Sequence, residues 1–133
     1  MGALEPGVMG QDPTHAVTFT DNHDTSRDDR FGSDDQIIMG YAYLFTHPGT
    51  PMAFWTDWNT ASIQSAIKSF INVRKNSGIT STAGVYIEQH TSGLYAAYIN
   101  SNVAIKLGTS SWSPSDPSFK VYTSGSNYAI WTK

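Results

Sequence analysis

The stretch Ala16-Val17-Thr18-Phe19-Thr20-Asp21-Asn22-His23-Asp24-Thr25 carries the strongest structural signal in this sequence. Its first half, residues 16–20, is rich in β-branched and aromatic residues and predicts a short β-strand. The strand leads into Asn22, His23 and Asp24, which are residue types that bind substrates and catalyse reactions. In parallel α/β proteins, ligands bind outside the carboxyl ends of the strands. The stretch therefore predicts an active-site edge of a parallel sheet.

A helix is expected after the loop formed by residues 21–32. Ser33 and Gln36 have the spacing of a capping box, which marks a helix start. Apolar residues then recur at helical spacing and give the helix one apolar face. They are Ile37, Ile38, Tyr41, Leu44 and Phe45. The turn His47-Pro48-Gly49-Thr50-Pro51 ends this helix.

A second strand and a second helix are expected next. The apolar run at residues 52–55 is typical of a short strand buried in a parallel sheet. Thr60 or Ser62 begins the second helix, and Gly78 ends it. Its apolar face consists of Ile63, Ala66, Ile67, Phe70 and Ile71. Residues 1–77 therefore predict the order β-α-β-α.

Residues 78–133 have no helical period and predict an all-β segment. Runs rich in β-branched and aromatic residues predict strands at 85–88, 94–99, 103–107, 119–122 and 128–131. Short strands at this spacing indicate an antiparallel sheet, with a Greek-key return across the loop at 108–118. The expected fold class is α+β, with one domain at 1–77 and a second at 78–133.

Composition excludes several classes of protein. The chain has 133 residues and a net charge of −3, and its eight Lys and Arg residues are scattered, unlike the basic patch of a nucleic-acid-binding protein. The absence of Cys excludes disulfides and thiolate metal sites. No apolar run is long enough to span a membrane. Residues 1–7 do not resemble a signal peptide, and the localisation stays open.

These motifs together resemble the α-amylase family of glycoside hydrolases, in its plant-like subgroup. The resemblance rests on Phe19 with Asn22-His23-Asp24, on His47-Pro48-Gly49-Thr50-Pro51 and on Asn127-Tyr128-Ala129-Ile130-Trp131. It implies two βα units of an incomplete (β/α)8 barrel, followed by an antiparallel, Greek-key-like β domain. A complete barrel needs about 250 residues, which is more than this chain contains.

The resemblance also implies roles for individual residues. Asp24 would be the third catalytic carboxylate, which hydrogen-bonds the hydroxyls of the scissile sugar, and His23 and Asn22 would bind the same sugar. The alternative for His23 and Asp24 is a structural hydrogen-bonded pair at the strand end. Trp55 would line the rim of the site or pack at the barrel end. Trp112, among small polar residues, would stack on α-glucan as an exposed ring.

The family's nucleophile and general acid would lie on strands upstream of this chain. Its only glutamates are Glu5 and Glu88, which are far apart in sequence. A substitute pair could come from the aspartates near Asp24, but Arg27 and Arg30 lie among them. Those aspartates are Asp21, Asp28, Asp29, Asp34 and Asp35. Weak or absent hydrolysis by this chain alone is therefore expected.

No cofactor or metal site is expected in this chain, because its histidines are dispersed and the family's calcium site lies mainly in a domain that the chain lacks. The expected partner is α-glucan or a maltooligosaccharide, without nucleic acid or membrane. Self-association through the partial barrel is also expected, because Val17, Phe19, Met52 and Phe54 would face a missing neighbour. Three hypotheses stay open: a hydrolase, a non-catalytic glucan-binding protein, and a structural or assembly unit.

Overall fold

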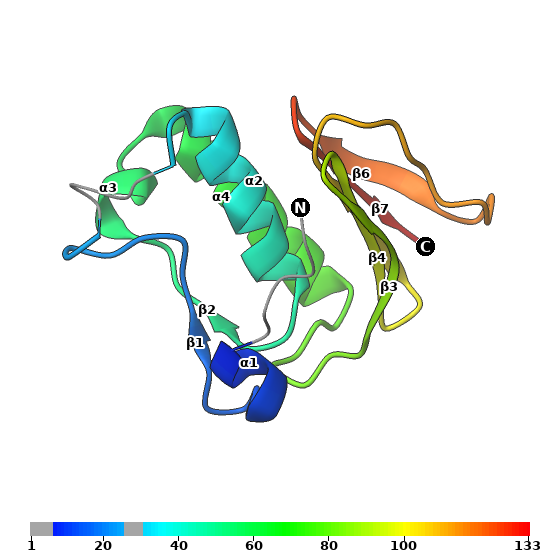
Figure 1. The fold of residues 1–133 in the computed structure, drawn as a ribbon, viewed down its shortest axis with the longest axis horizontal. Coiled ribbons are helices and arrows are strands. Elements are labelled where there is room, and N and C mark those ends of the chain that lie inside the picture. Colours follow the sequence, from blue (N-terminus) through cyan, green and yellow to red (C-terminus); the bar gives the residue numbers. More distant parts are fainter. Residues whose placement is uncertain (1–6, 26–30) are drawn as a thin grey trace.

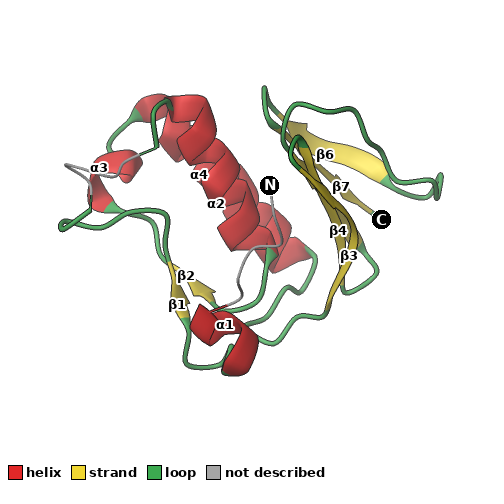
Figure 2. Cartoon of the chain, viewed as in Figure 1, coloured by secondary structure: helices red, strands yellow, loops and turns green. Residues whose placement is uncertain are grey.

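The computed structural model describes residues 7–25 and 31–133 and has an α+β fold. Two short parallel strands, a pair of long helices and a five-stranded antiparallel sheet follow one another across the molecule (Figure 1). The helices lie between the two parts that contain strands (Figure 2). No helix among the described residues is both long and apolar enough to cross a membrane.

The first segment contains α1 (Gly7–Gln11), β1 (Val17–Thr18), α2 (Asp34–Thr46), β2 (Thr50–Pro51), α3 (Trp55–Trp58) and α4 (Ala61–Asn76). Strands β1 and β2 are parallel, and Thr50 and Met52 donate backbone hydrogen bonds of 2.8 Å to Ala16 and Thr18. The described part of the first segment therefore has the expected order β-α-β-α, with the additional short helices α1 and α3.

The ends of the two long helices follow local sequence signals. The Ser33 side chain accepts a bond of 3.4 Å from the backbone N–H of Gln36 and caps α2, as expected. Helix α4 ends in a Schellman motif, because Gly78 has φ +66° and the N–H of Ile79 bonds the carbonyl of Arg74 at 3.0 Å. Helix α2 therefore begins, and helix α4 ends, where the sequence predicted.

The expected strand at residues 52–55 is wrong. Strand β2 ends at Pro51, Met52 is 39% exposed, and Trp55 begins helix α3. The hydroxyl of Tyr41 accepts the N–H of Phe54 at 3.0 Å and donates to the Asp57 carboxylate at 2.7 Å. These bonds hold the chain at Phe54 and Asp57 against α2, where it forms α3 instead of a strand.

The second segment forms one antiparallel sheet in the order β3-β4-β5-β7-β6. Its strands are β3 (Val85–Thr91), β4 (Leu94–Ile99), β5 (Val103–Leu107), β6 (Lys120–Ser124) and β7 (Tyr128–Thr132). The loop after β5 skips one strand position, and β7 then returns between β5 and β6. This order differs from the expected Greek key, in which the returning strand lies beside the first of three consecutive strands.

Both faces of the central strands β4, β5 and β7 are covered. Helices α2 and α4 pack on one face and share a core with it that includes Tyr41, Ile67, Phe70, Tyr95 and Ile105. The loop at 108–118 covers the other face, where Phe119, Trp131 and Ala104 form a smaller core. The division into domains at residue 77 stays a prediction, and the two segments share the larger core.

Close packing also fixes β1 on the helices. A Cβ at Gly40 would lie 2.8 Å from the Cγ2 atom of Thr20, so only glycine lets the chain after β1 approach α2 this closely. Val17 and Phe19, on the same segment, remain 58% and 46% exposed. The structure thus leaves an apolar face of β1 open to solvent.

Candidate functional site

The chain makes a tight turn at residues 21–25, directly after β1. The Asn22 side-chain oxygen accepts the backbone N–H groups of Asp24 and Thr25 at 2.8 and 3.1 Å. One carboxylate oxygen of Asp21 accepts the N–H of Asn22 at 2.9 Å and the Thr25 hydroxyl at 2.6 Å. Asp21 is only 4% exposed. A closed network of Asp21, Asn22 and Thr25 therefore defines this 21–25 turn.

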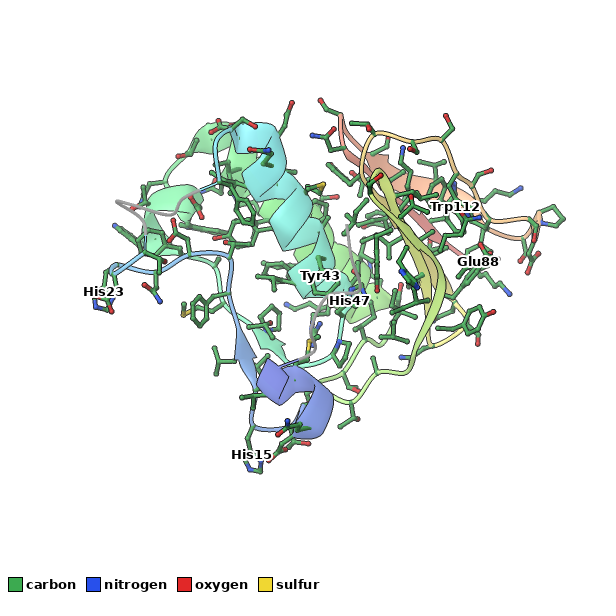
Figure 3. The ribbon with its side chains drawn as sticks, viewed as in Figure 1. His15, His23, Tyr43, His47, Glu88 and Trp112 are labelled. Atoms are coloured by element: carbon green, nitrogen blue, oxygen red, sulfur yellow. The ribbon has the colours of Figure 1, made fainter. Side chains whose placement is uncertain are left out.

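His23 and Asp24 project from the 21–25 turn into solvent. Their side chains are 86% and 79% exposed, and His23 Nε2 lies 3.3 Å from the nearer carboxylate oxygen of Asp24. Figure 3 shows His23 at the edge of the molecule farthest from the sheet. An adjacent carboxylate and imidazole that are both largely exposed can hydrogen-bond the hydroxyl groups of a ligand.

Trp55 lies at the start of α3 and is 73% exposed. Helix α3 and the 21–25 turn lie on the same side of the molecule, opposite the five-stranded sheet (Figure 1). Asp57, two residues further, is almost completely buried and accepts the Tyr41 hydroxyl. Burial, together with this carboxylate, raises the pKa of Tyr41 to about 12. Trp55 is therefore available to a ligand, whereas Asp57 has a structural role.

Trp112 is less exposed than the sequence suggested. Its ring is half-buried and makes edge-to-face contacts with Tyr98 and Trp131, at centroid distances of 5.8 and 5.6 Å. Its indole N–H donates to the Glu88 carboxylate at 2.8 Å. The expectation of a free ring among polar residues is therefore wrong, because the ring packs against aromatic residues of the sheet. Trp112 and His23 lie at opposite ends of the molecule (Figure 3).

The acidic residues considered as substitutes for the missing catalytic pair lie partly outside the described residues. Asp34 and Asp35 lie in the first turn of α2, where the helix dipole favours negative charge. Glu5, Arg27, Asp28, Asp29 and Arg30 lie outside the described residues, so the possible substitute pair near Asp24 stays untested. Within residues 7–25 and 31–133, no three His, Asp or Glu side chains are grouped as a metal would require.

An apolar groove of about 540 Å³ lies between α1, β1 and α2. Val8, Met9, Phe19, Phe31, Met39 and Tyr43 are among its lining residues. Val17 and Phe19, which also line it, are exposed, as is Met52, whereas Phe54 is half-buried. That these residues face a missing neighbour stays a prediction. The contribution of α1 to this groove was not predicted, because the sequence before residue 16 has no helical period.

Comparison with known proteins identifies the family. Residues 76–132 match the model of the alpha-amylase C-terminal beta-sheet domain. The chain is 33% identical to alpha-amylase type B isozyme of Hordeum vulgare, over 96% of its own length and 86% of that sequence. The chain belongs to the α-amylase family. The resemblance that the motifs indicated is thereby confirmed.

Other relatives in the α-amylase family are longer. Probable alpha-amylase 2 of Arabidopsis thaliana is 42% identical over 96% of this chain, but the chain spans only 32% of its length. Alpha-amylase 3, chloroplastic, of the same plant is 35% identical over 95% of this chain, and the chain spans only 14% of its length. The chain therefore corresponds to a minor part of these α-amylase sequences and includes the C-terminal β-sheet domain.

Proposed function

We propose that the 21–25 turn is part of the α-glucan site of an α-amylase-type hydrolase, with Asp24 as a catalytic carboxylate. The observation that supports this proposal is the pairing of an exposed carboxylate and an exposed imidazole on a hydrogen-bonded turn at the end of β1. Glycoside hydrolysis passes through an oxocarbenium-like transition state. A fixed anion near that centre stabilises its developing positive charge.

His23 and Trp55 would bind the sugar. The His23 imidazole is exposed beside Asp24, so it can donate a hydrogen bond to a hydroxyl of the same ring. The Trp55 indole is the most exposed large apolar side chain among the described residues, and an aromatic face can stack on a sugar. The Asn22 oxygen is already used within the turn, so its side-chain NH₂ group is the part that would donate to the sugar.

Asp24 cannot perform hydrolysis alone. A retaining enzyme needs a nucleophile and a general acid about 5–5.5 Å apart. We infer that β1 with α2 and β2 with α4 are the last two βα units of a (β/α)8 barrel, and that the nucleophile and acid belong to earlier units. We propose no calcium ligand in this chain, because the resemblance implies that the family's calcium site lies mainly in a domain that the chain lacks. Weak or absent starch hydrolysis by this chain alone follows from the proposal.

The decisive experiment is a titration of ¹⁵N-labelled protein with maltoheptaose, followed by NMR. The amide signals of His23 and Asp24 should shift as the sugar is added, and Asp24→Asn should weaken the interaction because the substitution removes the anion. His15→Gln is a matched control, because His15 is also exposed and pairs with Asp12. Shifts that are absent from residues 21–25 in the wild type would contradict the proposed site.

A second candidate function is non-catalytic α-glucan binding through Trp112. Tyr86 on β3 is 68% exposed and stacks on Tyr98, which in turn contacts Trp112. These three rings form a continuous aromatic surface on the sheet, far from the 21–25 turn. A stacking surface of this kind can hold a polysaccharide without any catalytic group.

A third candidate is an assembly role, in which the chain associates with a second copy through the open face of β1 and β2. Val17, Phe19 and Met52 are exposed there, and β1 is paired with a neighbouring strand on one side only among the described residues. An unpaired strand edge next to exposed apolar side chains favours association with another chain. A dimer is the expected form.

A further inference from the structure

We propose that Asn22 and Thr25 are positioning residues, which hold the backbone of the 21–25 turn so that His23 and Asp24 face the glucan. This inference rests on the glucan site proposed above. It assigns Thr25 a role that its position outside the Asn-His-Asp motif did not suggest. It also gives the Asn22 oxygen a structural role in place of the expected contact with substrate.

The first part of the argument is the direction of the hydrogen bonds. The Asn22 oxygen accepts from the two backbone N–H groups that follow His23, at Asp24 and Thr25. This is the pattern of a side chain that replaces a backbone carbonyl in a turn. Because both bonds end on the backbone around Asp24, they fix where its carboxylate emerges from the chain.

The second part is the anchor of the turn. The Thr25 hydroxyl donates to the Asp21 carboxylate at 2.6 Å and accepts from the N–H of Asn22 at 3.2 Å. Thr25 thereby joins the end of the turn to its beginning. A bond from a hydroxyl to a charged oxygen is stronger than one between neutral groups. Closing the turn in this way leaves little freedom for His23 and Asp24 between its ends.

The third part is the contrast in burial. Asp21 is 4% exposed, and its second carboxylate oxygen is buried without a hydrogen-bond partner among the described residues. Burying a carboxylate is costly unless hydrogen bonds stabilise its charge. Loss of the Thr25 hydroxyl, which donates one of these bonds, should therefore destabilise the turn. Asp24, by contrast, is 79% exposed. The two aspartates therefore have different functions: Asp21 anchors the turn, and Asp24 is presented to the ligand.

The test uses Asn22→Ala, Thr25→Val and Thr25→Ser, of which the last retains the hydroxyl. In the absence of sugar, the exchange of the Asp24 amide with water should be faster by about tenfold in Asn22→Ala, as expected for the loss of one hydrogen bond. With maltoheptaose as the probe, Thr25→Val should bind about tenfold more weakly, whereas Thr25→Ser should bind like the wild type. Unchanged amide shifts in β4 and β5 establish that the fold is intact.

Two results would overturn the inference: an unchanged exchange rate in Asn22→Ala, or equal maltoheptaose affinity in Thr25→Val and Thr25→Ser. If Thr25→Val does not fold, the exchange rate in Asn22→Ala alone decides. Failure of the glucan site is a separate result, because it would appear as a wild type whose Asp24 amide exchanges slowly but does not respond to maltoheptaose.

Discussion

The Nε2 atom of His47 lies 2.8 Å from the hydroxyl oxygen of Tyr95, and this bond joins the end of α2 to strand β4. The other ring nitrogen of His47 lies 2.9 Å from the carbonyl of Tyr43, which can only accept a bond. Nδ1 therefore carries the proton, and Nε2 accepts from Tyr95. With a neutral imidazole, both ring nitrogens are therefore paired at the contact between the helices and the sheet.

Stability should depend on pH through His47. Burial lowers the pKa of His47 from 6.5 to about 4 in the folded protein. As the pH falls from 6.5 to 4, the unfolded chain binds a proton that the folded protein does not bind, so the free energy of unfolding falls by about 3 kcal/mol. Urea unfolding at several pH values measures this slope.

The control for this effect is the slope in variants. His47→Asn should lower stability at neutral pH but remove this part of the pH dependence. An equally steep slope in His47→Asn would mean that other groups cause it.

Arg74 should contribute to stability through three carbonyl groups. Its guanidinium donates to the backbone oxygens of Phe45, His47 and Gly49, at 3.2, 2.8 and 2.7 Å. Arg74→Met leaves these oxygens without that donor and should lower the free energy of unfolding by about 1–3 kcal/mol. Lys75→Met, in the same helical turn but exposed, should change it by less than about 0.5 kcal/mol. Urea unfolding decides, and equal effects would refute the role of Arg74.

Purified protein should hydrolyse soluble starch weakly or not at all. Loss of one member of a catalytic set commonly lowers the rate by several orders of magnitude. Release of reducing sugar by wild type and Asp24→Asn, prepared free of host amylase, measures this. An ordinary amylase turnover that Asp24→Asn abolishes would contradict the prediction. It would then require a nucleophile or acid among the aspartates between residues 21 and 35.

Trp112→Ala should weaken retention on insoluble starch more than His23→Ala does. An aromatic surface can hold a polysaccharide by stacking, whereas a partial cleft buries little of the sugar. A pull-down with starch granules measures the bound fraction. Because Trp112 packs against Trp131, melting curves must show that the variant is folded. Equal retention of wild type and Trp112→Ala would rule out this surface.

The chain should form a dimer at micromolar concentration through the open face of β1 and β2. Burying one apolar side chain of this size contributes roughly 1.5–3 kcal/mol. Val17→Glu should therefore weaken association, whereas Val121→Glu on β6 is a matched control, because the two side chains are 58% and 61% exposed. Light scattering measures the mass. A value near 14.6 kDa that does not change on dilution would refute association.

The elements that could be predicted from the sequence are those with local signals. Ser33 and Gln36 mark the start of α2, Gly78 marks the end of α4, and the strands at 94–99 and 103–107 have the observed bounds. Each signal depends on residues close together in the chain. Hydrophobic period and capping chemistry are sufficient for such elements.

The elements that could not be predicted depend on distant residues. The strand expected at 52–55 is replaced by α3 because Tyr41, on another helix, binds Phe54 and Asp57. Trp112 is half-buried because Tyr98 and Trp131 lie beneath it. Within the candidate site, the Asn-His-Asp motif was recognisable, but the hydroxyl of Thr25 gains its role only when the turn closes.

The insertion of β7 between β5 and β6 has a consequence for the order of folding. Strand β6 pairs only with β7, so it cannot join the sheet until a later part of the chain has paired with β5. Before that step, β3, β4 and β5 can form only a meander with an open edge at β5, and β6 can pair only with β7. Pairing between strands far apart in sequence is slow, and intermediates with open edges aggregate. Substitutions that weaken β7 should therefore lower the yield of refolding more than they lower the equilibrium stability.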